Sequence, residues 1–128
     1  EPTAIPQLSL LAEVEGEPVG HVICSRGHVD EVPALGLGPL SVLPDHQGTG
    51  VGTALVRTVL GAAQALDEPV VALLGDPGYY ARFGFRPAAT LGLAAPDPAW
   101  GDHFQALDLG VGPVPTGTFR YAAPFDRL

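Results

Sequence analysis

Three glycines at alternate positions stand between a predicted strand and a predicted helix, in the segment PDHQGTGVGT from Pro44 to Thr53. Residues 35–42 predict the strand, and residues 50–66 carry apolar side chains at a spacing near 3.6, which predicts the helix. Such a loop points several backbone N–H groups at one place, where the helix dipole adds partial positive charge. Glycines let an anion approach without a Cβ clash. The segment predicts a site for an anion such as a pyrophosphate; the simpler alternative is a plain tight connection.

Two common phosphate-binding motifs do not fit this loop. The dinucleotide fingerprint G-x-G-x-x-G fails, because its third glycine would fall on Thr53 or Leu55. The chain has no lysine, which excludes the P-loop. What remains is the pattern Q-x-x-G-x-G at Gln47, Gly50 and Gly52. A general nucleotide-binding protein is therefore disfavoured.

Length and charge narrow the class of protein. The 128 residues are enough for one small domain. Fourteen acidic and six basic residues give a net charge of -8, which argues against a nucleic-acid partner. The sequence has no run of 18 apolar residues and no signal-peptide pattern, so no membrane partner is expected. The single cysteine, Cys24, fits a reducing compartment, and we expect a cytoplasmic protein.

The order of predicted elements indicates an α+β fold with mixed strand directions. Residues 15–18, EGEP, predict the turn of a hairpin. Residues 85–100 are rich in alanine and proline and give no assignment. Strands are expected at 8–14, 19–26, 35–42, 70–74, 103–109 and near 118–122, and helices at 50–66 and 78–83.

Two segments together resemble one protein family. Leu40-Ser41-Val42, Pro44 and the run QGTGVGT from Gln47 to Thr53 resemble the acetyl-CoA-binding motif of the GCN5-related N-acetyltransferases (GNAT). The run YYARFGF at 79–85 resembles a second family motif, in which a tyrosine stands four residues before the glycine of a Gly-Phe pair. The resemblance covers about residues 7–109. It implies the acyl-CoA acyltransferase fold of this family, an α+β fold of the three-layer α/β type with a mixed, mostly antiparallel sheet and flanking helices. The chain end, with Gly117, Tyr121 and Phe125, is similar to a bacterial subgroup of predicted acetyltransferases.

The resemblance implies acetyl-CoA as the cosubstrate and a set of residues that bind it. Backbone groups of the strand before the loop would pair with the pantetheine arm. The loop and the first helical turn would hold the pyrophosphate, mainly through backbone N–H groups. Residues 40–42 and 71–74 would splay apart and hold the thioester between them. The implied cofactor-binding residues are Leu40, Ser41, Val42, Gln47, Gly48, Thr49, Gly50, Val51, Gly52 and Thr53.

The same resemblance implies Tyr80 as the catalytic residue, which would give a proton to the departing CoA thiolate. A phenol suits this role, because it is neutral near pH 7 and can donate. The alternative is that Tyr80 packs as an aromatic in a short helix. Tyr79 is expected to pack, and Arg82 to lie on a solvated helix face, although it is within reach of a phosphate.

No general base is visible in the sequence. Many family members carry a glutamate on the strand that here is residues 70–74, which has no acidic residue. Asp76 is expected to be structural in an Asp-Pro turn, and His21 is a weak candidate. Cys24 is expected in the core. The histidines show no metal-site spacing, so no metal is expected.

The expected activity is N-acetyl transfer to a primary amine of an unidentified small molecule or peptide. The alternative is a non-catalytic acyl-CoA-binding or regulatory module on the same fold. A homodimer is one candidate assembly. Family members usually begin with a strand and two helices before the hairpin that here starts near Leu8. The resemblance therefore implies a single domain over residues 1–128 that lacks its N-terminal part.

Overall fold

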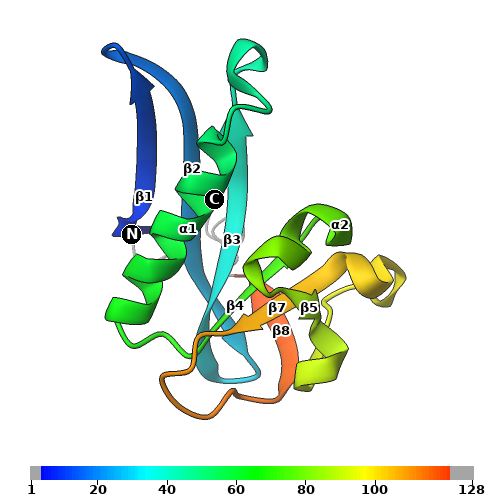
Figure 1. Cartoon of the computed structure of the whole chain (residues 1–128). Helices are drawn as coiled ribbons and strands as arrows, with labels where there is room; N and C mark the ends of the chain where they lie inside the picture. Colours follow the sequence, from blue (N-terminus) through cyan, green and yellow to red (C-terminus); the bar gives the residue numbers. More distant parts are fainter. Residues whose placement is uncertain (1–3, 122–128) are drawn as a thin grey trace, which may run out of the picture.

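The computed structural model describes residues 4–121, which form one curved sheet with few helices (Figure 1). The strands are β1 (Ala4–Val14), β2 (Glu17–Val29), β3 (Val32–Val42), β4 (Val70–Leu74), β5 (Arg86–Pro87), β6 (Leu93–Ala94), β7 (Phe104–Asp108) and β8 (Gly117–Tyr121). The α-helices are α1 (Val51–Ala65) and α2 (Pro77–Tyr80). Four 3-10 segments complete the chain: η1 (Pro44–His46), η2 (Ala81–Phe83), η3 (Ala88–Leu91) and η4 (Pro98–His103). Phe125 lies outside the described residues.

The sheet is mixed and mostly antiparallel, as predicted. Its strands follow the order β5-β7-β4-β3-β2-β8-β6, and β1 also pairs with β2. The parallel pairs are β3 with β4 and β6 with β8. β2 carries β1 along most of its length and β8 at its last three residues, 27–29. The predicted α+β class is therefore confirmed.

β3 and β4 separate after a short contact. Their pairing is limited to Leu35 with Val71 and Gly36 with Ala72. β3 then continues to Val42 while it remains paired with β2 on its other side (Figure 1). The register of β2 and β3 shifts by one residue at Gly38-Pro39, which is a β-bulge. The β3 edge that faces the opening toward β4 has no strand partner beyond Gly36 in residues 4–121.

Two hydrophobic clusters lie on the two faces of the sheet. α1 buries Leu55, Val56, Val59 and Ala63 against one face, at the spacing expected of an amphipathic helix. On the other face, Phe119 of β8 and Phe104 of β7 belong to the second cluster, with ring centroids 5.6 Å apart. The sheet is thus covered on both sides around its centre.

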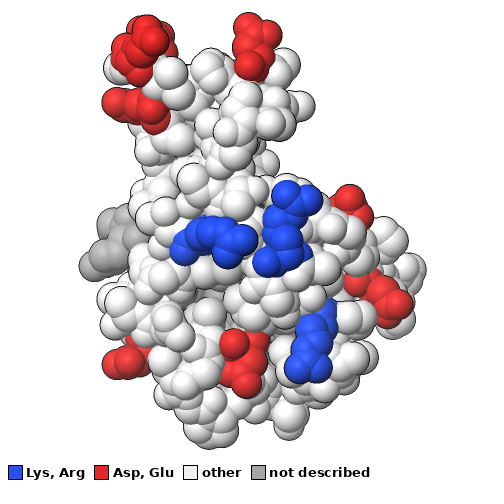
Figure 2. Space-filling view, viewed as in Figure 1, with Lys and Arg blue, Asp and Glu red and all other residues white. Residues whose placement is uncertain are grey.

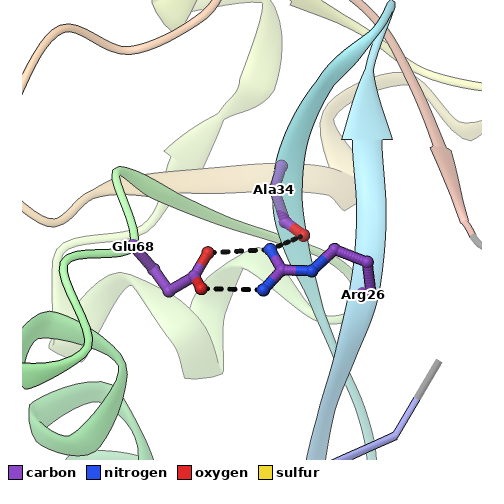
Figure 3. A network of polar contacts seen from close by, with 3 residues as sticks. All are labelled: Arg26, Ala34 and Glu68. Carbon is purple, nitrogen blue, oxygen red and sulfur yellow. Dashed lines mark hydrogen bonds and ion pairs between the residues drawn. The ribbon is translucent and has the colours of Figure 1, made fainter. Parts of the chain in front are cut away.

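Arg26 of β2 links the sheet to the connection between α1 and β4 (Figure 3). Its guanidinium donates two hydrogen bonds to the carboxylate of Glu68, at 2.9 and 2.8 Å, and a third to the carbonyl of Ala34 at 3.0 Å. The bidentate geometry fixes both planar groups. This contact holds the end of α1 beside β2 and β3.

Some element boundaries differ from those predicted. The β1–β2 turn contains only Glu15 and Gly16, both with positive φ, so Glu17 and Pro18 already belong to β2. Two residues with positive φ match the twist of a two-residue hairpin. Residues 85–100, left without assignment, hold β5, β6 and short 3-10 turns. No helix within residues 4–121 combines the length and the apolar character needed to cross a membrane.

Candidate functional site

A cavity of about 410 Å³ opens beside β3, at the beginning of α1. β3 supplies one wall, the loop between β3 and α1 supplies the floor, and the α2–η2 segment supplies the opposite wall. Seven of the ten predicted cofactor-binding residues line it. The lining residues are Leu40, Val42, Gln47, Gly48, Gly50, Gly52, Thr53, Tyr79 and Arg82.

The loop is held in shape by its own side chains. The amide nitrogen of Gln47 donates to the carbonyl of Val42 at 3.0 Å, and the hydroxyl of Thr49 donates to the carbonyl of His46. Gly48 has φ +77° and Gly50 has φ +93°, a conformation that side chains with a Cβ rarely adopt. The chain can therefore fold back and enter α1 directly at Val51.

A run of backbone N–H groups at this cavity has no hydrogen-bond partner in the described part of the chain. In the loop, His46 and Gln47 donate to Leu43 and Pro44, and the ordinary helix pattern starts at Ala54, which donates to Gly50 at 2.9 Å. Between them, the amides of residues 48–53 make no hydrogen bond within the described part of the chain. Unpaired amides at the positive end of a helix form a site for an anion.

Gly52 brings the backbone close to Tyr79. A Cβ placed on Gly52 would lie 3.1 Å from the Tyr79 hydroxyl, which is closer than ordinary packing allows. The hydroxyl of Tyr79 therefore lies over the first turn of α1. A side chain at position 52 would push it away and narrow the cavity.

Three predicted binding residues have side chains outside the cavity. Ser41 pairs with His21 of β2 and lines a separate shallow depression on that side of the sheet. Thr49 is turned back toward His46, and Val51 contacts Gly20 and the apolar surface between α1 and β1. Backbone contacts of these residues do not depend on the direction of their side chains.

Tyr80 lies beside the end of β4 and is half-buried. Its ring lies against Gly75, directly after β4, and packs at 5.8 Å between ring centroids against Phe85. Burial, with a smaller contribution from Tyr79, raises the pKa of the Tyr80 phenol above its ordinary value of 10.0. The phenol is therefore protonated at neutral pH, and the proton-donor role remains a prediction.

Tyr79 and Arg82 line the cavity, although the sequence analysis expected Tyr79 to pack and Arg82 to lie on a solvated helix face. The Tyr79 ring does pack against Tyr80 and Phe83, and Arg82 is exposed, within reach of the cavity. The guanidinium of Arg82 lies 4.4 Å from the Tyr79 ring centroid, and its Nε donates to the Tyr79 carbonyl at 2.9 Å. Tyr79 and Arg82 are three residues apart, and residues at this spacing share one face of a helical turn. This spacing is the sequence signal that could have placed both side chains at the cavity.

The lining residues include no acidic residue and no histidine. Asp76 accepts a hydrogen bond from the Gly78 N–H and caps α2, a structural role. Cys24 is fully buried, and burial, with a smaller contribution from Glu68, raises the pKa of its thiol to about 12. A cysteine nucleophile is thus excluded at neutral pH.

Comparison with known proteins identifies the family. The model of the "Acetyltransferase (GNAT) domain" matches residues 6–87, which run from β1 to β5 and include the glycine loop and the α2–η2 segment. The chain belongs to the GNAT family of acetyltransferases. An uncharacterized N-acetyltransferase of Escherichia coli (strain K12), YjhQ, is 40% identical over 131 residues, covering 95% of this GNAT chain and 72% of the relative.

Two solved GNAT structures share the fold and contain ligands. The GNAT family N-acetyltransferase YhbS from Escherichia coli, solved in complex with CoA, has a TM-score of 0.81 and 31% identity, over 94% of this chain and 69% of that one. A GNAT family acetyltransferase from Brucella melitensis, solved with acetyl-CoA, has a TM-score of 0.73 and 37% identity, over 92% and 68%. At 31% and 37% identity, the two proteins resemble this chain in sequence as well as in fold.

Proposed function

We propose that this GNAT protein transfers the acetyl group of acetyl-CoA to a primary amine of a small molecule or peptide. The observation that carries the proposal is the row of unpaired amides from Gly48 to Thr53 at the positive end of α1, beside the free edge of β3. The unpaired amides suit the pyrophosphate of CoA. The free edge of β3 suits the extended pantetheine arm, which carries amide groups. The CoA and acetyl-CoA complexes of the two related structures support the same ligand.

The pyrophosphate would bind the loop amides, with Thr53 adding its hydroxyl. Helix N-termini favour anions through their dipole and their free N–H groups. The pantetheine arm carries two amides, and the unpaired edge of residues 40–42 offers it backbone hydrogen bonds like those of an added strand. The thioester would then lie in the opening between β3 and β4, close to Tyr80.

The reaction needs a neutral amine, because only the lone pair of the nitrogen can attack the acetyl carbonyl. Attack forms the C–N bond, and collapse of the tetrahedral intermediate breaks the C–S bond and releases the thiolate. Tyr80 would give its phenolic proton to the sulfur, the nitrogen would lose a proton to water, and water would return a proton to the Tyr80 phenolate. The raised pKa of Tyr80 keeps its phenol protonated at neutral pH.

A protein general base is not part of the proposal. The cavity lining offers neither a carboxylate nor an imidazole. The amine would reach the site already neutral, or pass its proton to ordered water. Activity should then rise with pH as the free amine becomes neutral, following the pKa of the acceptor rather than that of an enzyme carboxylate.

A direct assay tests the function. The protein is incubated with acetyl-CoA and a panel of small-molecule and peptide amines, free thiol is followed with time, and acetylated products are identified by mass spectrometry. We expect thiol release that depends on the amine. Absence of both turnover and CoA binding by calorimetry would contradict the proposal. Tight CoA binding without turnover on any amine would support the non-catalytic module instead.

Location and assembly complete the proposal. We propose a cytoplasmic bacterial enzyme, because its one cysteine, Cys24, is a free and buried thiol and the two solved GNAT relatives are bacterial. A homodimer is the assembly to test. Native mass spectrometry at micromolar concentration would give the subunit number, and a monomer would contradict the dimer.

A further inference from the structure

Tyr121, the last residue of β8, lies directly on the backbone of β3. A Cβ placed on Gly36 would lie 2.6 Å from Cε1 of the Tyr121 ring, which is closer than a real Cβ comes to another atom. Gly36 is also the last residue of β3 that pairs with β4, through Ala72. The Tyr121 ring therefore lies over the point where β3 and β4 separate, at the opening where the proposed function places the thioester.

Two glycines on neighbouring strands make room for the aromatic side chains of β8. A Cβ placed on Gly27 of β2 would lie 2.8 Å from the ring of Phe119, as one on Gly36 would meet Tyr121. Phe119 and Tyr121 are alternate residues of one strand, so both face the same side of the sheet. Their rings meet edge to face with centroids 4.9 Å apart. The position of the Tyr121 ring is thus fixed by the backbone beneath it and by the ring beside it.

β8 is also anchored by contacts that do not involve Tyr121. The N–H of Asp30 donates to the carbonyl of Thr118 at 2.9 Å, and the N–H of Thr118 donates to the Asp30 carboxylate at 3.1 Å. Phe119 is fully buried in the second hydrophobic cluster. Substitutions of Tyr121 should therefore leave the strand in place.

Tyr80 and Tyr121 lie on opposite faces of the sheet. Tyr80 packs against the hydrophobic cluster that contains α1 residues, whereas Tyr121 continues the side of β8 that carries Phe119 of the second cluster. The cavity beside α1 would be filled by the cofactor. The face with Tyr121 is then the one from which an amine can reach the acetyl carbonyl.

Leu74 adds a second apolar side chain at the opening on this face. It ends β4, two residues and about 7 Å beyond Ala72. Side chains alternate along a strand, so Leu74 faces the same side as Ala72, a member of the second cluster. Leu74 is 46% exposed and Tyr121 is 41% exposed. Two accessible apolar side chains there suit a ligand with an apolar body.

The groups at this point of the sheet carry no charge. Burial raises the pKa of the Tyr121 phenol above its ordinary value of 10.0, so the phenol is neutral at neutral pH. The first acidic residue after β4, Asp76, already accepts the N–H of Gly78. Figure 2 shows acidic side chains at the far end of the β1–β2 hairpin, on the face that carries α1. A polycation would be attracted to such carboxylates more than to Tyr121 and Leu74.

We infer that Tyr121 and Leu74 bind the acceptor and make the enzyme select primary amines on an aromatic or aliphatic group over polyamines. The inference rests on the proposed function, because it takes the thioester to lie between β3 and β4. The apolar group of the acceptor would pack on the Tyr121 ring and on Leu74, with its nitrogen directed at the carbonyl. An aromatic ring provides a large contact area for such a group.

The experiment compares two acceptors on five proteins. Thiol release at saturating acetyl-CoA gives kcat and KM for 2-phenylethylamine and for spermidine. The proteins are the unmodified chain, Tyr121→Ala, Tyr121→Phe, Leu74→Ala and the control Leu11→Ala. Leu11 is also an exposed leucine, and it lies on β1, away from β3 and β4. Thermal unfolding checks that each protein is folded.

We expect the unmodified chain to have a kcat/KM for 2-phenylethylamine at least about tenfold above that for spermidine, as apolar contacts of this kind allow. Tyr121→Ala should raise the KM for 2-phenylethylamine by about tenfold and Leu74→Ala by about threefold, through lost apolar contact. Tyr121→Phe keeps the ring and should keep this KM. The KM values for spermidine and for acetyl-CoA should stay unchanged in all variants, as should every value in Leu11→Ala.

Several outcomes would overturn the inference and leave the function intact. They are a higher kcat/KM for spermidine, an effect of Leu11→Ala as large as that of Tyr121→Ala, and acetylation of other amines but not of 2-phenylethylamine. If Tyr121→Ala does not fold, the comparison of Leu74→Ala with Leu11→Ala decides. Absence of turnover with every amine would overturn the inference and the proposed function together.

Discussion

Tyr79 and Tyr80 are adjacent in the chain, yet their rings meet different parts of the site. Tyr79 lies over Gly52 in the cavity, whereas Tyr80 packs on Gly75 and Phe85 beside the end of β4. Tyr80→Phe keeps the ring and removes only the hydroxyl. We expect kcat to fall by about a hundredfold, as loss of a general acid predicts, with the dissociation constant of acetyl-CoA unchanged. Thiol release followed with time gives kcat, and calorimetry gives the dissociation constant of acetyl-CoA.

Tyr79→Phe is the matched control, because it removes a hydroxyl one residue away. If kcat falls in Tyr79→Phe and not in Tyr80→Phe, the proton-donor role belongs to Tyr79.

The pH profile of kcat is a second test of the role of Tyr80. A raised pKa keeps the Tyr80 phenol protonated further into the alkaline range, so kcat should not fall through its ionisation below pH 10. A fall in kcat between pH 8 and 9 that disappears in Tyr80→Phe would contradict the raised pKa of the Tyr80 phenol.

Gly50 combines a backbone requirement with an electrostatic one. It has φ +93° and stands directly before α1, among the amides proposed to bind the pyrophosphate. Gly50→Asp adds a negative charge where an anion should bind, and Gly50→Asn adds nearly the same volume without charge. Asn and Asp tolerate positive φ similarly, so backbone strain is matched.

The two variants should therefore separate in acetyl-CoA affinity and not in stability. We expect Gly50→Asp to bind at least about tenfold more weakly than Gly50→Asn, since a like charge near the ligand destabilises the complex by more than 1 kcal/mol. Calorimetry at constant salt measures the difference. Equal affinities of the two variants would place the pyrophosphate elsewhere.

At the scale of elements, the contact between Arg26 and Glu68 joins β2, β3 and the end of α1. The side chains are 25% and 13% exposed, so the pair lies between a surface bridge and a buried one. Glu68→Gln keeps the shape and removes the charge. We expect the free energy of unfolding to fall by about 1–3 kcal/mol, because the largely buried guanidinium loses its charged partner. Urea denaturation measures the change.

Glu17→Gln serves as the control for this stability change. Glu17 is exposed at the start of β2 and forms no ion pair among the described residues. Its substitution should alter the free energy of unfolding by at most about 0.5 kcal/mol, as for other surface positions. A loss in Glu68→Gln no larger than that of Glu17→Gln would show that the ion pair does not stabilise the fold.

The predictability of each element follows from what determines it. The sequence predicts the helix at 50–66 within one residue of α1 at each end, because its apolar spacing and the glycine loop before it are local features. β4 was predicted as residues 70–74 because all its positions are apolar. β5 and β6 contain two residues each and exist only through pairing with β7 and β8, so no local pattern could indicate them.

The same distinction holds for the candidate site. The glycine motif located seven of the nine cavity-lining residues, because the loop and helix start carry their geometry in their own sequence. Tyr79 and Arg82 come from a segment 26 or more residues later, and their orientation depends on how the turn of η2 follows α2.

At the scale of the whole molecule, the sheet joins two hydrophobic clusters, while the cavity lies beside the last residues of β3, between that strand and the α2–η2 segment. β3 has no pairing with β4 beyond Gly36, and a ligand bound along this edge would supply part of the missing contact. Ligand binding should therefore stabilise the entire fold by mass action, because the unfolded chain has no such site.

This coupling predicts a thermal shift that is specific for the ligand. Acetyl-CoA at a hundred times its dissociation constant should add about 2.7 kcal/mol to the free energy of unfolding, and raise Tm by roughly 10 °C for a domain of this size. Differential scanning fluorimetry measures the shift, with ATP and NAD at the same concentration as controls and Gly50→Asp as the variant with a damaged loop. The failed dinucleotide and P-loop fingerprints predict little shift with either control. A larger shift with ATP or NAD than with acetyl-CoA would contradict the proposed ligand. It would show that the loop amides bind the phosphates of a nucleotide in preference to those of acetyl-CoA.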